Sequence, residues 1–485
     1  MKIITHPYRV AESLFGHAEL GDARRVRGLV AFAAGLISKP RGRISQVFSS
    51  AKERERAYRF VENPLVRVEA LLIAMALGCR RLIEKMRWVF ILVDGSSLNL
   101  ADPHCTKNFG QVGSHTKGAR GIKVISAYAV AEDGTPIGTA WQKYWARFKR
   151  ARRGSKSNDN RRRKTEDKET QHWLDVILDV VHHIATHNLW FIIDREGDSR
   201  AILETLIATG RRFTVRATHN RLLTGLLRGR KRYLHQAMRK APVRGTFVVD
   251  VPGGPKRIAR KARMVVRAGQ HDILLRDVSR HTSASIHVSV AWAREEGTTP
   301  RGEERLDWML LTNAPVATKA DVLAVIHSYR VRWRIEDFHK AWKSGHCHVE
   351  DMQLHTLKSA TIFAVMHAAI AARVERLKHL ARTNPNAKAS SEFSLEEHAA
   401  LAALVESEFN KPPVPGGRRQ KIYAVPDYAS MTVHDVIEWI ARLGGYTGKS
   451  SGGPPGSTTI GRGLELIIQA ARLLAVVGKP RRSDQ

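Results

Sequence analysis

Residues 329–343 have the sequence YRVRWRIEDFHKAWK, which decides the expected fold class and the expected chemistry. A single helix over this stretch would place four polar side chains within roughly 60° of one another, namely Tyr329, Arg332, Glu336 and Lys343. Its opposite face would be apolar, with Val331, Ile335, Phe338 and Trp342. A carboxylate beside two cations and a phenol suits a site that holds a metal ion and a phosphate together. A surface helix with charge pairs four residues apart is the alternative explanation.

Two apolar segments of strand character are expected to end at aspartates, residues 88–94 at Asp94 and residues 188–194 at Asp194. Residues at the ends of buried strands are where an α/β sheet exposes its chemistry. Each aspartate alone could equally cap a turn. Together with Glu336, they form a set of hard oxygen donors that suits Mg²⁺ or Mn²⁺. Two such ions can activate an attacking oxygen and stabilise a departing one in a substitution at a phosphodiester.

The composition narrows the class of partner. The chain has 485 residues, which is typical of about three domains. Its 80 Lys and Arg residues against 46 Asp and Glu give a formal charge of +34, which indicates a polyanion, most often nucleic acid. A membrane surface is the rival partner, but we expect no apolar run to reach the ~18 residues of a spanning helix. The N-terminal residues lack a signal-peptide pattern, which favours a cytosolic protein. The three scattered cysteines indicate neither a disulfide framework nor a zinc site.

The pattern along the chain predicts three regions. Residues 1–75 are basic and helical, which is typical of a small module placed against a duplex. Residues 76–360 alternate between strands and helices, with two strands expected around the turn at 132–134, a helix expected at 170–187, and a β-rich insertion at about 217–315. A further helix is expected at 359–380. Residues 361–485 are again helical, with a last helix expected to begin at Leu464. Two polar segments are expected to be a loop and a linker, at 147–164 and 411–421.

Several motifs carry a resemblance to a known family. The spacing Tyr-x2-Arg-x3-Glu-x6-Lys resembles the YREK signature of the bacterial DDE cut-and-paste transposases of the IS-four group, the transposon Tn-five type. The segment DREGD at 194–198 resembles the DREAD-like sequence of these enzymes, with Gly197 in place of the alanine. The segments AYRFVENP at 57–64 and IARLGG at 440–445 resemble parts of the same family. The family resemblance extends through most of the chain.

The resemblance implies an α/β fold with an RNase H-like catalytic core and a β-rich insertion, flanked by an N-terminal helical DNA-binding module and a C-terminal helical dimerisation region. It implies that two Mg²⁺ or Mn²⁺ ions per active site are held by three acids, Asp94, Asp194 and Glu336. Of the other acids in DREGD, Glu196 is not expected to bind metal and Asp198 is expected to cap the next helix.

Other side chains take roles from the same resemblance. Phosphates would be positioned by Tyr329, Arg332 and Lys343, and Arg216 would contact the DNA backbone near the active site. Trp308 would receive a flipped base, although a buried strand aromatic is the alternative. The N-terminal module would bind DNA ends through a group of arginines, each of which could also belong to a solvated face: Arg24, Arg25, Arg27, Arg41, Arg43, Arg54, Arg56 and Arg59.

The implied protein is a transposase that binds terminal inverted repeats as a homodimer, excises its element through a hairpin intermediate and inserts it into target DNA. Two alternatives stay open. One is a DNA-binding inhibitor or domesticated transposase without catalysis, which would have no need of all three acids. The other is a glycoside hydrolase that uses two of the carboxylates. A neutral sugar gives no reason for a charge of +34.

Overall fold

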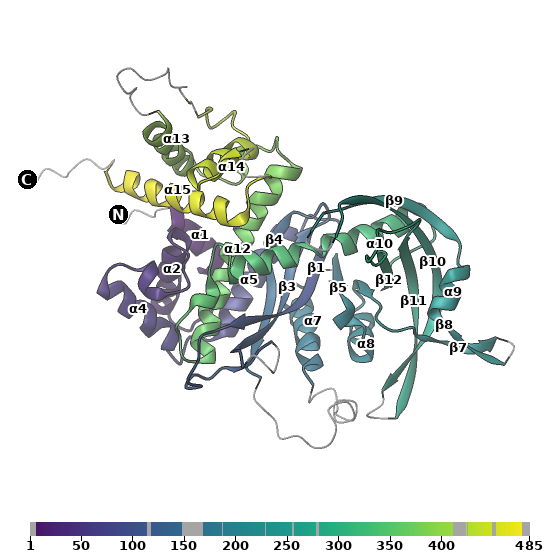
Figure 1. Cartoon of the computed structure of the whole chain (residues 1–485). Helices are drawn as coiled ribbons and strands as arrows, with labels where there is room; N and C mark the ends of the chain where they lie inside the picture. The colour runs from purple at the N-terminus through teal and green to yellow at the C-terminus, as the bar shows by residue number, and fades with distance from the viewer. Residues whose placement is uncertain are drawn as a thin grey trace, which may run out of the picture.

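The structure is a computed structural model that describes residues 6–113, 118–147, 168–186, 188–227, 229–254, 257–277, 281–410, 423, 425–448 and 453–477. The expected linker at 411–421 lies outside the described residues, as does the expected loop at 147–164 except for Arg147. The described part is a mixed α/β architecture built on one mixed sheet, with a helical N-terminal region (Figure 1).

Within the described residues, the sheet has twelve strands, and its main path runs β2-β3-β1-β5-β6-β12-β11-β10-β7-β8, with β4 paired to β3 and β9 paired to β10. Strands β1, β5 and β6 are parallel, whereas the other pairs are antiparallel. The two strands expected around the turn at 132–134 are confirmed as β3 and β4. The strands of this half are β1 (Val89–Asn99), β2 (Gly110–Gln111), β3 (Arg120–Ala131), β4 (Pro136–Trp145), β5 (Leu189–Ile193) and β6 (Arg212–Arg216).

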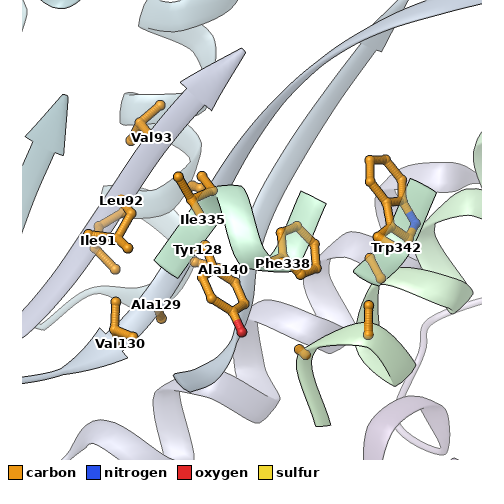
Figure 2. Packing of buried hydrophobic residues seen from close by; sticks show 14 of the residues in the cluster. Ile91, Leu92, Val93, Tyr128, Ala129, Val130, Ala140, Ile335, Phe338 and Trp342 are labelled. Carbon is orange, nitrogen blue, oxygen red and sulfur yellow. The ribbon is translucent and has the colours of Figure 1, made fainter. Parts of the chain in front are cut away.

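Helices cover both faces of the parallel strands because side chains alternate along a strand. On β1, Phe90 contacts His327 of α10 with ring centres 6.0 Å apart, while Gly95 lies against Trp173 of α7. On the α10 side, Tyr128 of β3 stacks on Phe338 of α11 at 4.5 Å, a contact that Figure 2 shows within the core. The helices of these layers are α7 (Thr170–Ile184), α8 (Arg200–Ala208), α10 (Lys319–Val331) and α11 (Arg334–Lys343).

The β-rich insertion extends the same sheet, because β12 pairs with β6. The insertion also contains one short helix, α9, which the sequence analysis did not predict. On β10, Ala262, Met264 and Val266 are buried, whereas the residues between them are exposed or partly exposed. One face of the insertion is therefore packed here. The other, called the open face, is exposed at Arg263 but is covered by α9 farther along, where Arg267 donates to the carbonyl of Ala241 and Trp292 stacks on His235. Its elements are β7 (Leu222–Leu227), β8 (Arg230–Tyr233), α9 (Leu234–Lys240), β9 (Val243–Val251), β10 (Arg260–Asp277), β11 (Thr282–Glu295) and β12 (Asp307–Thr312).

The long helix α12 (Leu357–Thr383) joins the sheet to the helices at both ends of the chain (Figure 1). Phe363 of α12 contacts Phe32 of α2 at 6.1 Å, and Ser359 donates to the carbonyl of Val61 in α4. The N-terminal helices are α1 (His6–Phe15), α2 (Ala23–Ser38), α3 (Ile44–Val47), α4 (Ala51–Glu62) and α5 (Val68–Ile83).

By length and composition, α12 could cross a membrane, so the expectation that no apolar run is long enough was wrong. However, 78% of its apolar window is buried inside the protein. The apolar length of α12 therefore serves the core, where the helix is surrounded on most sides by other helices and by β4.

The C-terminal helices are α13 (Leu395–Phe409), α14 (Val433–Leu443) and α15 (Ser457–Val477). The expected start of the last helix at Leu464 was wrong, because α15 begins seven residues earlier at Ser457. The glycines in this first part are required by packing: a Cβ on Gly463 would lie 1.7 Å from the carbonyl oxygen of Ile440, and a Cβ on Gly461 would lie 2.1 Å from His346. These glycines mark a close helix contact and not a loop. The boundaries expected near residues 75 and 360 both fall inside helices, and the division into domains stays a prediction.

Candidate active site

The signature stretch forms two helices, and the expectation of one helix over 329–343 was wrong. The chain leaves α10 at Val331, turns through Arg332 and Trp333, and enters α11 at Arg334. In this turn, the amides of Arg332, Ile335 and Glu336 donate to carbonyls three residues earlier, which tightens the backbone relative to an α-helix. The apolar side is confirmed, since Val331, Ile335, Phe338 and Trp342 are buried.

The two aspartates lie side by side at one edge of the sheet. The expectation that a strand ends at Asp94 was wrong, because β1 continues to Asn99 through its pairing with β3. However, the parallel pairing of β1 with β5 ends at Val93 and Ile193. Asp94 and Asp194 are the next residues on the two strands, so they are neighbours at the point where the sheet opens.

The three acids converge on a single cation, the guanidinium of Arg332. Its nitrogens lie 2.8 Å from Glu336, 3.5 Å from Asp194 and 4.0 Å from Asp94. The side chain of Arg332 is only 9% exposed, whereas those of Asp94, Asp194 and Glu336 are 23%, 30% and 38% exposed. The acids therefore face solvent with the arginine beneath them.

The charges of this group depend on one another. Burial raises the pKa of Asp94 to about 6; the charge of Arg332 opposes this rise, and the charges of Glu196 and Glu336 add to it. Burial alone would lower the pKa of Arg332, but Asp194 and the neighbouring acids hold it above the usual range. The arginine therefore stays charged and partly neutralises three carboxylates that repel one another.

Tyr329, Arg216 and Trp308 extend the site toward the β-rich insertion. The hydroxyl of Tyr329 donates to Asp194 at 3.0 Å, and Arg216 donates to that hydroxyl at 3.3 Å. Burial and the charge of Asp194 raise the pKa of Tyr329 to about 12, so the phenol remains a donor. The ring of Trp308 lies 5.8 Å from that of Tyr329 and is partly exposed. The structure thus brings Arg216, Tyr329 and Trp308 to the acids.

Lys343 lies apart from this group. Its ammonium pairs with Glu350 at 3.6 Å, and Glu350 also accepts from the amide of Asn99 at 2.8 Å. The turn at Arg332 and Trp333 divides the expected single helical face, so that Tyr329 lies on α10 and Lys343 lies on α11. Lys343 still acts at a distance, since its charge contributes to lowering the pKa of Lys123 after burial and Arg147.

Two residues near the acids, Lys123 and His339, were not predicted from the sequence, and a third, Glu196, was expected only not to bind metal. Lys123 of β3 donates to Ser97 of β1 at 3.0 Å and lies on the same strand pair as Asp94, a proximity that only the sheet pairing reveals. Glu196 approaches Gly95, where a Cβ would lie 3.2 Å from its carboxylate. The glycine directly after Asp94 was the sequence signal for this close approach. His339 is buried, and one of its ring nitrogens lies 3.2 Å from the hydroxyl of Ser126.

Asp198 does not cap α8, so that expectation was wrong. Ser199 is the N-cap and accepts from the amide of Ile202. Asp198 is instead buried and accepts from the amides of Thr218 and His219, and it pairs with Arg221. Its carboxylate fixes the chain that follows β6 and Arg216.

The N-terminal arginines divide into two groups. One group is engaged within the protein: Arg41 pairs with Glu465 of α15 at 2.9 Å, and Arg25 and Arg54 donate to backbone carbonyls. Arg59 is exposed and pairs with Glu55 on the same helix. The other group is exposed on the surface and consists of Arg24, Arg27, Arg43 and Arg56.

The donor set of the site fits a divalent metal by its chemistry. Three carboxylates offer hard oxygen ligands, and they surround a position of positive charge. Within the described residues, no three acids, histidines or cysteines stand close enough to hold a metal as they are placed. The residues that would hold such an ion are Asp94, Asp194 and Glu336.

Comparison with protein families gives two matches. Residues 8–66 match the model described as transposase DNA-binding, which covers α1 to α4. Residues 167–372 match the model described as transposase DDE domain. The second match contains Asp194, Glu336 and the residues from Arg216 to Lys343 described above, whereas Asp94 precedes it. DDE domains of this kind generally use divalent metal ions. The two matches support a DNA transposase.

Proposed function

From a chain that carries a transposase DNA-binding region and a transposase DDE domain, we propose a metal-dependent cut-and-paste transposase of the IS-four group, Tn-five type. Its substrate would be the terminal inverted repeats of its own element in the bacterial cytoplasm. The observation that carries the proposal is the convergence of Asp94, Asp194 and Glu336 on Arg332 at one sheet edge. Inert DNA-binding proteins have no need for three mutually repelling carboxylates in one place.

Two Mg²⁺ or Mn²⁺ ions on these acids would supply activation of the attacking oxygen and stabilisation of the leaving oxygen. The protein side chains would position the substrate. Arg216 and Tyr329 would hold the phosphate near Asp194, because an arginine fork and a phenol donor both suit phosphate oxygens. Arg332 would balance the acids before the ions and DNA arrive. Lys343 would contact DNA at a second point, beside Lys123. Trp308 would accept a flipped base at the side of Tyr329.

The proposed reaction consists of substitutions at phosphorus. Water attacks the phosphate at the element end, the bond to the 3′ oxygen breaks, and a 3′-OH is left. This hydroxyl attacks the phosphate of the opposite strand and forms a hairpin, and the flanking DNA leaves. A second water attacks the hairpin phosphate and frees the same 3′-OH, which then attacks a target phosphate and displaces the 3′ oxygen of the target strand. Synapsis would need a homodimer. The exposed apolar side chains at the end of α15, such as Leu473 and Val476, support pairing through the C-terminal helices.

The test is the substitution Glu336→Gln, which preserves the shape of the side chain and removes its charge. We expect binding to end DNA to persist and Mg²⁺-dependent cleavage to fall at least 100-fold, beyond the roughly 10–100-fold typical of groups that only support metal ligands. A gel shift and a cleavage assay on the same duplex measure both. Asp337→Asn is the matched control, since Asp337 is the next residue and pairs with Lys378 away from the acids. Cleavage by Glu336→Gln within a few-fold of wild type would contradict the proposal.

A further inference from the structure

We propose that the open face of the β-rich insertion carries a second DNA-backbone site, which holds phosphates beyond the scissile one. The site is a pocket lined by Arg239, Arg267, Arg294 and Arg305 around Trp292, here called the arginine pocket. The proposal rests on the proposed function only for the identity of the DNA. The arginine pocket itself follows from the alternation of the strands, from charge and from its place on the sheet.

The side chains of β10 alternate between a buried and a more exposed face of the sheet. Ala262, Met264 and Val266 are buried, while Arg263, Val265 and Arg267 point to the other face and are exposed or partly exposed. An antiparallel sheet can leave one face to water, and such a face is normally mixed in charge. Beside α9, this face carries Arg267 and Arg294 and forms a hollow of about 300 Å³ around the buried side chain of Trp292. The hollow is large enough for a phosphate group together with part of its sugar.

The side chains that line the arginine pocket have a net positive charge. Two acids also line it, Glu295 and Glu296. Glu295 is buried and pairs with Arg260 at 2.8 Å, and Glu296 pairs with Arg263 at 3.3 Å, so both are matched by arginines outside the arginine pocket. Of the four arginines, Arg267 donates to the carbonyl of Ala241 and Arg294 pairs with Asp307 at 3.6 Å, whereas Arg239 and Arg305 are exposed at the rim. Several guanidinium forks around one hollow favour a ligand with several anionic oxygens, as in a phosphodiester backbone.

The arginine pocket lies at the same edge of the sheet as the acids. Strands β1, β5 and β6 are parallel, β12 is antiparallel to β6, and β11 is antiparallel to β12. The carboxyl end of β11, which carries Arg294, therefore lies at the same edge as Asp94 and Asp194. One residue joins the two places: the carbonyl of Asp307 accepts from Arg216, and its carboxylate accepts from Trp292 at 2.7 Å.

The order of strands sets the spacing. From β5, which carries Asp194, to β11 there are three strand intervals, about 14 Å at roughly 4.8 Å each. Successive phosphates of one DNA strand advance by about 3.4 Å along the axis, so the arginine pocket would meet a phosphate about four nucleotides from the one at the acids. The helices that match the DNA-binding family lie on the other side of the acids, beyond β4 (Figure 1). The arginine pocket therefore fits DNA beyond the element end, either the donor flank or the target.

The experiment uses the full chain with Arg239→Gln and Arg305→Gln together. The control is Arg80→Gln with Arg81→Gln, because these exposed arginines end α5 near the start of β1, at the opposite edge of the sheet. Three duplexes are compared: an end cut at the scissile phosphate, the same end with flanking DNA, and a random-sequence duplex. We expect unchanged binding of the precut end. For a duplex that enters the arginine pocket, the negative slope of log K against log salt should become shallower by about 1.8, or 0.9 per lost cation.

The three duplexes distinguish donor flank from target DNA as the ligand of the arginine pocket. A loss on the flanked end assigns the arginine pocket to donor flank, and a loss on the random duplex together with weaker joining of precut ends assigns it to target DNA. Unchanged slopes on all three duplexes would overturn the site, as would an equal loss on the precut end. If wild-type protein neither cleaves nor joins DNA but the slopes still change, the proposed function fails and the arginine pocket stands.

Discussion

Arg332 shows how one residue can hold an acidic site together. Three carboxylates close to one another would repel strongly at neutral pH, and Arg332 lowers this cost because its guanidinium reaches all of them. Asp94 lies farthest of the three from the arginine, at 4.0 Å, although it accepts from the amide of Gly95 at 2.9 Å, and burial raises its pKa to about 6. The site therefore keeps a destabilised charge at one of the residues proposed to hold a metal ion.

This destabilised charge predicts that Asp94→Asn stabilises the metal-free protein. The pKa of Asp94 rises from 3.8 to about 6 on folding, so its charge costs up to about 3 kcal/mol above pH 6. The folded state binds the proton more tightly, so the cost shrinks as pH falls below 6 and disappears below the unfolded value. We expect the gain from Asp94→Asn to be largest at pH 7.5 and to fall to about half at pH 5. Urea unfolding in EDTA at both pH values measures it, and an equal or absent gain would refute the assigned destabilisation.

At this scale, the sequence singled out Asp94, Asp194 and Glu336 from local features, and the structure places all three around Arg332, while their role as metal ligands stays a prediction. The sequence could not predict that Arg332 is their common partner, since that depends on the turn between two helices. The sequence also placed Lys343 on one helical face with Tyr329, because the turn between the two helices was not predicted. Asp198 was misassigned because its partners, at Thr218 and Arg221, come from the segment after another strand.

At the scale of elements, α11 is held in place by a buried polar network as well as by its apolar face. His339 contacts Ser126 at 3.2 Å, Gln142 donates to Ser126 at 3.1 Å, and Tyr144 donates to Gln142 at 2.9 Å. Ser126 is also the cross-strand partner of Asp94. The network therefore fixes the helix that carries Glu336 against the strands that carry Asp94.

This arrangement predicts that His339→Leu weakens metal use as well as stability. Burial, followed by the charge of Lys343, lowers the pKa of His339 to about 3, so the neutral ring acts by hydrogen bonding. Its loss leaves buried partners unsatisfied at a cost of about 1–3 kcal/mol. We expect the Mg²⁺ concentration for half-maximal cleavage to rise several-fold, because Glu336 lies one turn away.

His367→Leu is the control for this prediction. His367 is also buried, but its ring nitrogens contact the carbonyls of Phe363 and Arg41. Its substitution should cost similar stability and leave the Mg²⁺ dependence unchanged. An equal shift in both variants would mean that His339 acts only through folding.

Sequence patterns predicted many elements, including α7, α12 and the hairpin of β3 and β4, because their periodicity is strong. The extension of β1 beyond Asp94 was not predictable, since residues 95–99 have little strand character and are held by pairing with β3. The joining of the insertion to the core sheet through β6 and β12 is also long-range.

At the scale of the whole molecule, α12 makes the regions interdependent. It packs on the N-terminal helices, on β4 and on the C-terminal helices. Lys378 of α12 pairs with Asp337 of α11 at 3.7 Å and donates to Ser457 at the start of α15. Deleting the N-terminal helices would therefore expose core surface, and point substitutions are the better probe of DNA binding.

Substitutions in the two groups of N-terminal arginines should have different effects, one on DNA binding and the other on stability. Arg24 and Arg27 are exposed on α2 within the region that matches the DNA-binding family. Replacing both with Gln should weaken binding to end DNA. The negative slope of log K against log salt should become shallower by about 1.8, at 0.9 per lost phosphate contact. Thermal stability should change little. Arg41 instead pairs with Glu465, whose side chain is 9% exposed, so Arg41→Gln should lower the melting temperature and leave the salt slope unchanged. Fluorescence anisotropy across a salt series and thermal unfolding test both variants. If Arg41→Gln changes the slope as much as the double variant does, the division of the arginines is wrong and the fold does not decide which of them meets DNA.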